Sequence, residues 1–187
     1  MAGVHMTNDS TELVVLVDDI DKPIGTAPKA SVHTTDTPLH RAFSLFVFNS
    51  AGAILLTQRA KNKKTFPGVW TNTACGHPGP DETRIDAAKR RLVKELGITS
   101  EVEILEVAPY RYRFADAGGT VENEICPVFI AYFDGDPHPD TSEVNAWKWM
   151  AWKTFLTDLA SDARIYSPWC REEALLVAAY LQKNGST

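Results

Sequence analysis

Short apolar runs separated by polar turns recur along most of the chain, and runs of this length predict β-strands. A β-branched run from Glu12 to Val17 ends before Lys22-Pro23, where a turn is expected. The runs at 42–48 and 53–57 are separated by Asn49-Ser50-Ala51-Gly52, which predicts a β-hairpin with a four-residue loop. Further strands are predicted at 69–74, 102–107, 110–114, 121–133 and 146–152.

Two segments have the pattern of helices instead. The first begins near Glu82 and ends at Gly97, a residue type that suits the position just after a helix. Its apolar positions follow the 3.6-residue period: Ile85, Ala88, Leu92 and Leu96. The second begins with Pro168 at the first helical position and extends to about Gln182.

The order β-rich, helix, β-rich, helix predicts an α/β (α+β) fold, an α/β/α sandwich with a mixed β-sheet. We expect one domain over residues 12–182, a loose head at 1–11 and a loose tail at 183–187. Met6 fits a natural start, with residues 1–5 as a remnant of cloning. One domain agrees with the length of 187 residues, because soluble domains usually have about 100–200 residues.

Composition and charge exclude several classes of protein. Hydrophobic residues make up 44% and charged residues 23%, as in an ordinary globular domain. The net charge of −5 argues against binding nucleic acid or an anionic membrane through global charge. An anionic ligand would therefore need a local cluster of basic residues.

The cysteines indicate a reducing compartment. Cys75, Cys126 and Cys170 are odd in number and far apart, so they form neither a disulfide framework nor a CxxC metal motif. No apolar run approaches the roughly 18 residues of a membrane span, and the first residues lack a signal peptide's pattern. We expect a cytoplasmic protein.

The segment from Gly76 to Ile98 has the spacing of the Nudix box, the loop and helix that bind a metal-complexed diphosphate. Carboxylates one turn apart on a helix can share a divalent ion. However, Arg91 and Lys94 stand where Nudix hydrolases carry glutamates, which weakens the prediction of a hydrolase. On its own, the helix could also be a solvated surface with Arg91 and Glu95 as an ordinary ion pair.

Further motifs extend this resemblance from about Glu12 to Trp169. They are HTTDTPLH (33–40), FPGVW (66–70), TNTACGHP (71–78), YRYR (110–113), ENEICPVF (122–129) and SPW (167–169). In this order they resemble the type I isopentenyl-diphosphate isomerases of the Nudix superfamily. The resemblance implies the Nudix fold and a metal-dependent 1,3-proton shift that converts isopentenyl diphosphate to dimethylallyl diphosphate in isoprenoid biosynthesis.

The resemblance also implies two metal sites. Glu122 and Glu124 share one face of a strand because side chains alternate with period two. The family's ligand set adds three histidines: His33, His40 and His77. Such nitrogen and oxygen ligands suit Mn²⁺, Mg²⁺ or Zn²⁺. At the second site, Glu95 and the backbone carbonyl of Cys75 are expected to hold a Mg²⁺ that arrives with the diphosphate.

The family's acid and base match Cys75 and Glu124, with Tyr112 as the hydrogen-bonded partner of Glu124. Trp169 matches the tryptophan that covers the hydrocarbon end of the substrate, where an indole face stabilises a cation. Without this resemblance, a buried packing role would be the default for Cys75 and Trp169. Cys126 and Cys170 are expected to pack.

The diphosphate is expected to bind four cationic residues: Lys29, Arg59, Lys63 and Arg91. Lys61 and Lys64 are left open, because a charged run such as RAKNKK is usually a solvated loop. The expected partner is a small diphosphate, with no nucleic acid and no membrane, and the protein is expected to be a monomer or homodimer.

Two alternatives remain. A Nudix pyrophosphohydrolase would release phosphate from nucleoside diphosphate derivatives and would retain the box glutamates, which Arg91 and Lys94 replace. A non-enzymatic binding module would have lost Cys75, Glu124 or the histidines, and all of these are present.

Overall fold

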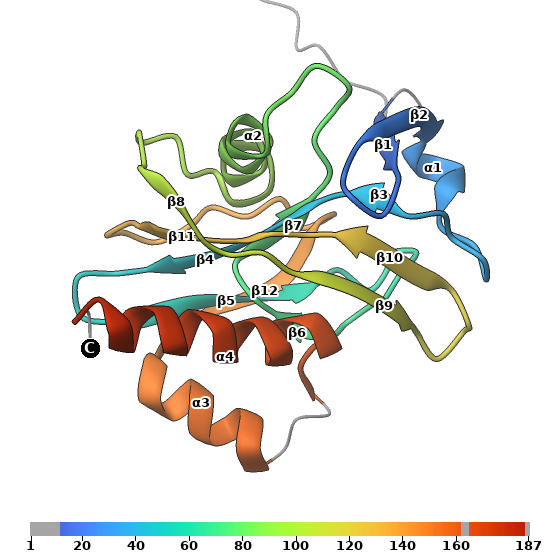
Figure 1. Ribbon diagram of the computed structural model, residues 1–187. Coiled ribbons are helices and arrows are strands. Elements are labelled where there is room, and N and C mark those ends of the chain that lie inside the picture. The colour runs from blue at the N-terminus through green and yellow to red at the C-terminus, as the bar shows by residue number, and fades with distance from the viewer. Residues whose placement is uncertain (1–11, 162–164, 186–187) are drawn as a thin grey trace, which may run out of the picture.

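The computed structural model of the protein describes residues 12–161 and 165–185 (Figure 1). The head predicted at residues 1–11, with the remnant of cloning expected at 1–5, lies outside the described residues. No helix in the described ranges is both long and apolar enough to cross a membrane.

The chain alternates between strands and helices. The strands are β1 (Leu13–Val17), β2 (Pro23–Pro28), β3 (His40–Arg41), β4 (Phe43–Phe48), β5 (Ala53–Arg59), β6 (Trp70–Thr71), β7 (Ala74–Gly76), β8 (Ile104–Ala108), β9 (Arg111–Ala115), β10 (Val121–Ile125), β11 (Val128–Tyr132) and β12 (Val144–Ala151). The helices are α1 (Lys29–Val32), α2 (Arg84–Leu96), α3 (Trp152–Ser161) and α4 (Pro168–Lys183).

The strands form two mixed sheets. The smaller sheet has the order β2-β1-β3-β10-β9, and the larger has the path β12-β5-β4-β11-β8, with β6 on β5 and β7 on β4. The pairs β3–β10 and β4–β11 are parallel, and the other pairs are antiparallel. Helix α2 lies on one side of the larger sheet and α3 and α4 lie on the other (Figure 1), so the predicted α/β/α sandwich is confirmed.

The alternation of side chains along β4 divides the core. Phe43 and Leu45 belong to the cluster that contains the apolar face of α2. Phe46 and Phe48 point the other way, into the cluster that contains α3 and α4. Ser44 lies between Phe43 and Leu45 in sequence, so this buried polar residue faces α4.

The predicted strand at 121–133 is broken, and that prediction is wrong at one point. Pro127 has no N–H to donate to a ladder, and the chain divides there into β10 and β11. At the break, the N–H of Ala42 donates to the carbonyl of Ile125 at 2.9 Å, and that of Ser44 donates to the carbonyl of Pro127 at 3.1 Å. The paired segments β3–β4 and β10–β11 thus pass together from the smaller sheet into the larger one.

Helix α2 begins two residues later than predicted. Thr83 is its N-cap and accepts a hydrogen bond from the N–H of Asp86 at 3.1 Å. Glu82 stays in the preceding loop because its carboxylate accepts from the N–H of Gly79 and pairs with Arg90. The predicted end is confirmed, since Gly97 has a positive φ of 62°.

Other differences concern short or polar elements. Ile85 was expected on the apolar face of α2 but is 39% exposed, whereas Ala87 is buried. The strand predicted at 69–74 is two short strands, β6 and β7. The sequence did not predict β2, α1, β3 or α3. The predicted hairpin at 49–52 and the helix beginning at Pro168 are confirmed.

Candidate active site

A cavity of about 400 Å³ collects nearly all of the predicted functional residues. Its lining draws on both sheets and on α1, α2 and α4. Of the predicted residues, the lining includes Lys29, His33, Arg59, Lys63, Cys75, His77, Arg91, Glu95, Tyr112, Glu122, Glu124 and Trp169. His40 is fully buried and does not line the cavity.

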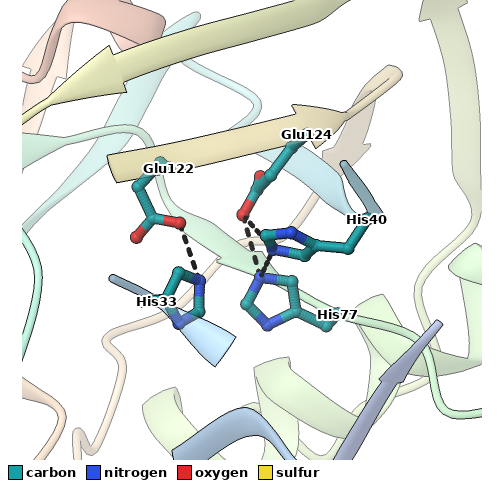
Figure 2. A group of neighbouring side chains, drawn as sticks. All are labelled: His33, His40, His77, Glu122 and Glu124. Carbon is teal, nitrogen blue, oxygen red and sulfur yellow. Dashed lines mark hydrogen bonds and ion pairs between the residues drawn. The ribbon is translucent and has the colours of Figure 1, made fainter. Parts of the chain in front are cut away.

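The three histidines and two glutamates come together, as the family resemblance implies (Figure 2). One ligand atom from each of the five residues lies within 4.8 Å of all the others. The smaller sheet sets this arrangement, because β10 carries both glutamates and its residue Glu124 is the parallel partner of His40 on β3. His33 follows α1 and His77 follows β7.

The contacts inside this cluster fit a metal ion. Nε2 of His33 lies 2.9 Å from Oε2 of Glu122, yet both atoms are buried and have no hydrogen-bond partner of suitable geometry. The Nε2 atoms of His40 and His77 face each other at 3.2 Å. A pair of buried polar atoms that approach without satisfying each other, as in His33 and Glu122, is typical of ligands around a shared cation, and the five residues together fit a divalent ion.

Glu124 is the negative centre of the cluster. Its Oε1 lies 2.8 Å from Nε2 of His77 and 3.4 Å from Nε2 of His40. Burial would raise the pKa of Glu124, but the hydrogen bonds from His40 and His77 outweigh it and hold the pKa well below its ordinary value. Burial lowers the pKa of His77 to about 4, so this imidazole is neutral at pH 7 and can act as a ligand.

Tyr112 binds the second oxygen of Glu124. Its hydroxyl donates to Oε2 at 2.6 Å, and the two residues are direct partners across β9 and β10. Burial raises the pKa of Tyr112 well above its ordinary value, so the phenol keeps its proton and remains a donor. The family resemblance implied this pair, and the structure brings the two side chains into contact.

The Cys75 thiol lies on β7 in the larger sheet and lines the same cavity as Glu124. Its Sγ lies 3.3 Å from Oγ of Ser44 and 3.2 Å from Oδ1 of Asn72. Burial raises the pKa of Cys75 to about 12, so the group is a protonated thiol at neutral pH.

An aromatic wall closes one part of the cavity. Trp169 is 2% exposed and stacks on Tyr112, with ring centroids 5.7 Å apart and an interplanar angle of 15°. Phe66 packs edge to face against the indole of Trp169, and the Arg59 guanidinium lies 5.8 Å from the centroid of the indole ring. The tryptophan is thus both part of the core and part of the cavity wall.

Carboxylates form ion pairs with the cationic residues that line one side of the cavity. Arg91 is 2% exposed and donates to Glu12 at 2.7 Å and to Glu95 at 3.1 Å, so the ion pair expected within α2 is present. Lys29 also pairs with Glu12, at 2.8 Å. Gly76 permits this arrangement, because a Cβ there would lie 3.2 Å from the side chain of Arg91.

The loop from 59 to 65 supplies the other cations. Lys63 forms an ion pair with Glu143, and the guanidinium of Arg59 donates to the carbonyl of Thr65 at 2.8 Å. Lys64, left open by the sequence, also lines the cavity, whereas Lys61 does not. Burial raises the pKa of Glu95, the carboxylate expected at the second metal site.

Several residues around the cavity were not predicted. Glu12 and Glu143 pair with its cations, Ser44 and Asn72 contact the thiol, and Glu173 accepts a hydrogen bond from Ser44. One signal was available for Glu173, because it lies four residues from both Trp169 and Val177 and therefore on the buried face of α4. Glu12 and Glu143 have no such signal, since their contacts are long-range.

Comparison with known proteins first defines the class. Residues 38–170 match the NUDIX domain, so the chain is a NUDIX-domain protein. Among solved structures, a Deinococcus radiodurans protein superposes with a TM-score of 0.70 at 18% identity, covering 87% of this chain and 97% of that one. A MutT protein from Methanosarcina mazei Go1 gives 0.63 at 20% identity, covering 79% and 96%. These likenesses show the fold alone.

Closer relatives define the family. A protein of Saccharopolyspora erythraea named isopentenyl-diphosphate Delta-isomerase is 49% identical, over 87% of this chain and 84% of the relative. A protein of the same name from Clavibacter sepedonicus is 52% identical, over 85% and 84%. The chain therefore belongs to the isopentenyl-diphosphate Delta-isomerase family.

Proposed function

We propose that the protein is an isopentenyl-diphosphate isomerase, which moves a double bond by a 1,3-allylic proton shift and gives dimethylallyl diphosphate. The observation that supports this most is the cavity itself. Cys75 from the larger sheet and Glu124 from the smaller one line it together, beside a cationic side that includes Lys29 and Arg91. An acid, a base and a diphosphate site are what this reaction needs.

Cys75 and Glu124 are the proposed acid and base. One group delivers a proton to the alkene and makes a tertiary carbocation, and the other removes a proton from the adjacent carbon. Tyr112 donates to Oε2 of Glu124 at 2.6 Å, so its hydroxyl is the proposed path for the proton of this carboxylate. The reaction is reversible, so the two groups exchange roles with direction.

Trp169 is the proposed stabiliser of the carbocation. Its ring lies against the cavity, with Tyr112 and Phe66 fixing its orientation from two sides. An aromatic face in a desolvated site stabilises a cation by about 2 kcal/mol. The same apolar wall excludes water, which would otherwise capture the cation.

His33, His40, His77, Glu122 and Glu124 are the proposed ligands of one divalent ion, Mn²⁺, Mg²⁺ or Zn²⁺. When bound, such an ion supplies positive charge that fixes the carboxylate of Glu124. Glu95 and the backbone carbonyl of Cys75 are the proposed ligands of a Mg²⁺ that accompanies the diphosphate.

The diphosphate is proposed to bind Lys29, Arg59, Lys63 and Arg91. All four line the cavity, and carboxylates already pair with three of them: Glu12 with Lys29 and Arg91, and Glu143 with Lys63. A bound diphosphate would share these cations with Glu12 and Glu143. We also propose a cytoplasmic location, because Cys75, Cys126 and Cys170 are all free thiols.

Product analysis separates this proposal from a pyrophosphohydrolase. We expect the enzyme with Mg²⁺ to convert isopentenyl diphosphate to dimethylallyl diphosphate and to release no phosphate from it or from nucleoside diphosphate derivatives. Cys75→Ala should abolish the conversion and leave the fold intact. Phosphate release by the wild-type protein without isomerisation would reject the proposal.

A further inference from the structure

A buried carboxyl group lies behind the thiol of Cys75 and has no part in the mechanism above. Glu173 is on α4 and is 0% exposed. Its Oε2 accepts a hydrogen bond from Oγ of Ser44 at 2.7 Å, and its Oε1 is buried without a hydrogen-bond partner. None of the described residues forms an ion pair with it. A buried, half-satisfied carboxyl is costly, so its presence needs a reason.

Ser44 connects this carboxyl to Cys75. Ser44 and Cys75 are direct partners across β4 and β7, and their Oγ and Sγ atoms lie 3.3 Å apart. Asn72 braces the pair, because its Nδ2 lies 3.2 Å from Oγ of Ser44 and its Oδ1 lies 3.2 Å from Sγ of Cys75. Of these residues only Cys75 lines the cavity, so the network approaches the thiol from behind.

Glu173 is fully buried, accepts one hydrogen bond and has no ion pair among the described residues, and this environment favours the neutral carboxylic acid. Burial accordingly raises the pKa of Glu173 well above its ordinary value. A carboxylic acid can accept through its carbonyl oxygen and donate through its hydroxyl. A serine hydroxyl has one proton and can give it to only one partner at a time. The hydrogen bonds that link Glu173, Ser44 and Cys75 can therefore run in either of two directions.

When Cys75 is a thiol, the S–H donates to Ser44 or Asn72 and the hydroxyl of Ser44 donates to Glu173. The acid proton of Glu173 is then on Oε1, the oxygen without a partner. When Cys75 is a thiolate, the direction reverses. The carboxyl turns over and donates to Ser44, and Ser44 donates to the sulfur. The proton lost by sulfur goes to the substrate carbon, and Glu173 and Ser44 each keep their own.

We propose that Glu173 is a positioning residue that acts through Ser44 to supply a hydrogen bond to Cys75 whenever the sulfur has lost its proton. Only the expected effect on kcat rests on the proposed function. Whichever direction the reaction takes, Cys75 gives or receives a proton, so the thiolate occurs in every turnover. Glu173 itself does not touch the substrate.

Substitution of Glu173 tests this inference, with a matched control in the next residue. Glu173→Met keeps the length of the side chain but removes donor and acceptor, and kcat should fall about tenfold or more, with KM unchanged. Glu173→Gln can still donate and should retain more of kcat than the methionine variant. Glu172→Gln changes an exposed carboxylate whose partner is Tyr110, and it should behave as wild type.

Alkylation of the thiol gives a readout that needs no substrate. Iodoacetamide reacts with thiolates, and only Cys75 is accessible, because Cys126 and Cys170 are 0% exposed. In the metal-loaded protein at fixed pH, Glu173→Met should slow this reaction about tenfold. Slower alkylation in a protein that fails to isomerise the substrate would support the network and reject the proposed function.

Unchanged kcat and unchanged alkylation in folded Glu173→Met would overturn the inference, as would equal loss in both Glu173 variants. If Glu173→Met does not fold, Ser44→Ala tests the same chain, because it removes the hydroxyl between the carboxyl and the thiol. It should show the same fall in kcat and alkylation, and wild-type values would overturn the inference.

Discussion

The hydroxyl of Tyr112 donates a hydrogen bond of 2.6 Å to Oε2 of Glu124, the oxygen opposite the one that the histidines contact. The two residues face each other across β9 and β10, so the sheet register fixes the contact. One oxygen of this carboxylate thus faces the histidines of the cluster, and the other accepts a hydrogen bond from the tyrosine hydroxyl. In the proposed mechanism, this division lets a single residue act as ligand and as acid or base.

Tyr112→Phe tests this division. Removing the hydroxyl should lower kcat about 10- to 100-fold, because a hydrogen bond to a charged group contributes about 1.5–3 kcal/mol. The bound metal, measured by elemental analysis, should not change, since Tyr112 is not among the clustered ligands. Tyr110→Phe is the control, because the Tyr110 hydroxyl bonds to Glu172 at the surface. Equal effects of the two substitutions would argue against the role of Tyr112.

The metal ligands can be tested one at a time. His77→Ala and His33→Ala should each lower the affinity of the cluster for the metal about 10-fold or more, because each removes one ligand of five. His138→Ala should leave the metal content unchanged, since His138 is exposed and outside the cluster. Full metal occupancy in His77→Ala would remove this residue from the ligand set.

The basic loop offers a matched pair for diphosphate binding. Lys63→Ala should raise KM about tenfold with a smaller change in kcat, because Lys63 lines the cavity and a charge-assisted contact would be lost. Lys61→Ala should leave KM unchanged, since Lys61 is exposed and does not line the cavity. Steady-state kinetics at constant ionic strength measure both, and equal KM values would reject Lys63 as a binder.

Glu12 should make stability depend on pH. Burial would raise the pKa of Glu12, but Arg91 and Lys29 outweigh it and hold the pKa well below its ordinary value. A lowered carboxylate pKa stabilises the folded state above the unfolded value of 4.5, and this contribution is lost as the pH falls below it. Glu12→Gln should therefore lower the free energy of unfolding by about 1–3 kcal/mol at pH 7.

The difference in the free energy of unfolding between wild type and Glu12→Gln should be constant between pH 7 and about pH 5 and should shrink below pH 5. Urea unfolding at several pH values measures it. A deficit that grows as the pH falls would contradict the ion pairs of Glu12 with Arg91 and Lys29.

Local pattern predicted the elements that pack in the core. The apolar run at 42–48 gives β4, and the period of Leu92 and Leu96 gives the buried face of α2. The local pattern gave wrong bounds where another interaction competes with it. Glu82 is kept out of α2 by its bonds to the loop, and Pro127 interrupts a run that otherwise reads as one strand.

Family motifs predicted the site more completely than pattern alone could. Alternation placed Glu122 and Glu124 on one face, but their convergence with His33 depends on how the loop after α1 joins β10. The spacing on α4 indicates that Glu173 is buried, but neither its bond to Ser44 nor the ion pair of Glu143 with Lys63 could be predicted, because these contacts join residues 129 and 80 positions apart. Such contacts depend on tertiary packing, which no local spacing specifies.

Proton NMR of the metal-loaded enzyme with isopentenyl diphosphate in D₂O tests the central claim most directly. The account predicts that dimethylallyl signals appear and that deuterium enters the product, because the proton delivered to the alkene comes from groups that exchange with solvent. Cys75→Ala and Glu124→Gln should show neither change while remaining folded. Unchanged substrate with the wild-type enzyme, or full activity in either variant, would contradict the account.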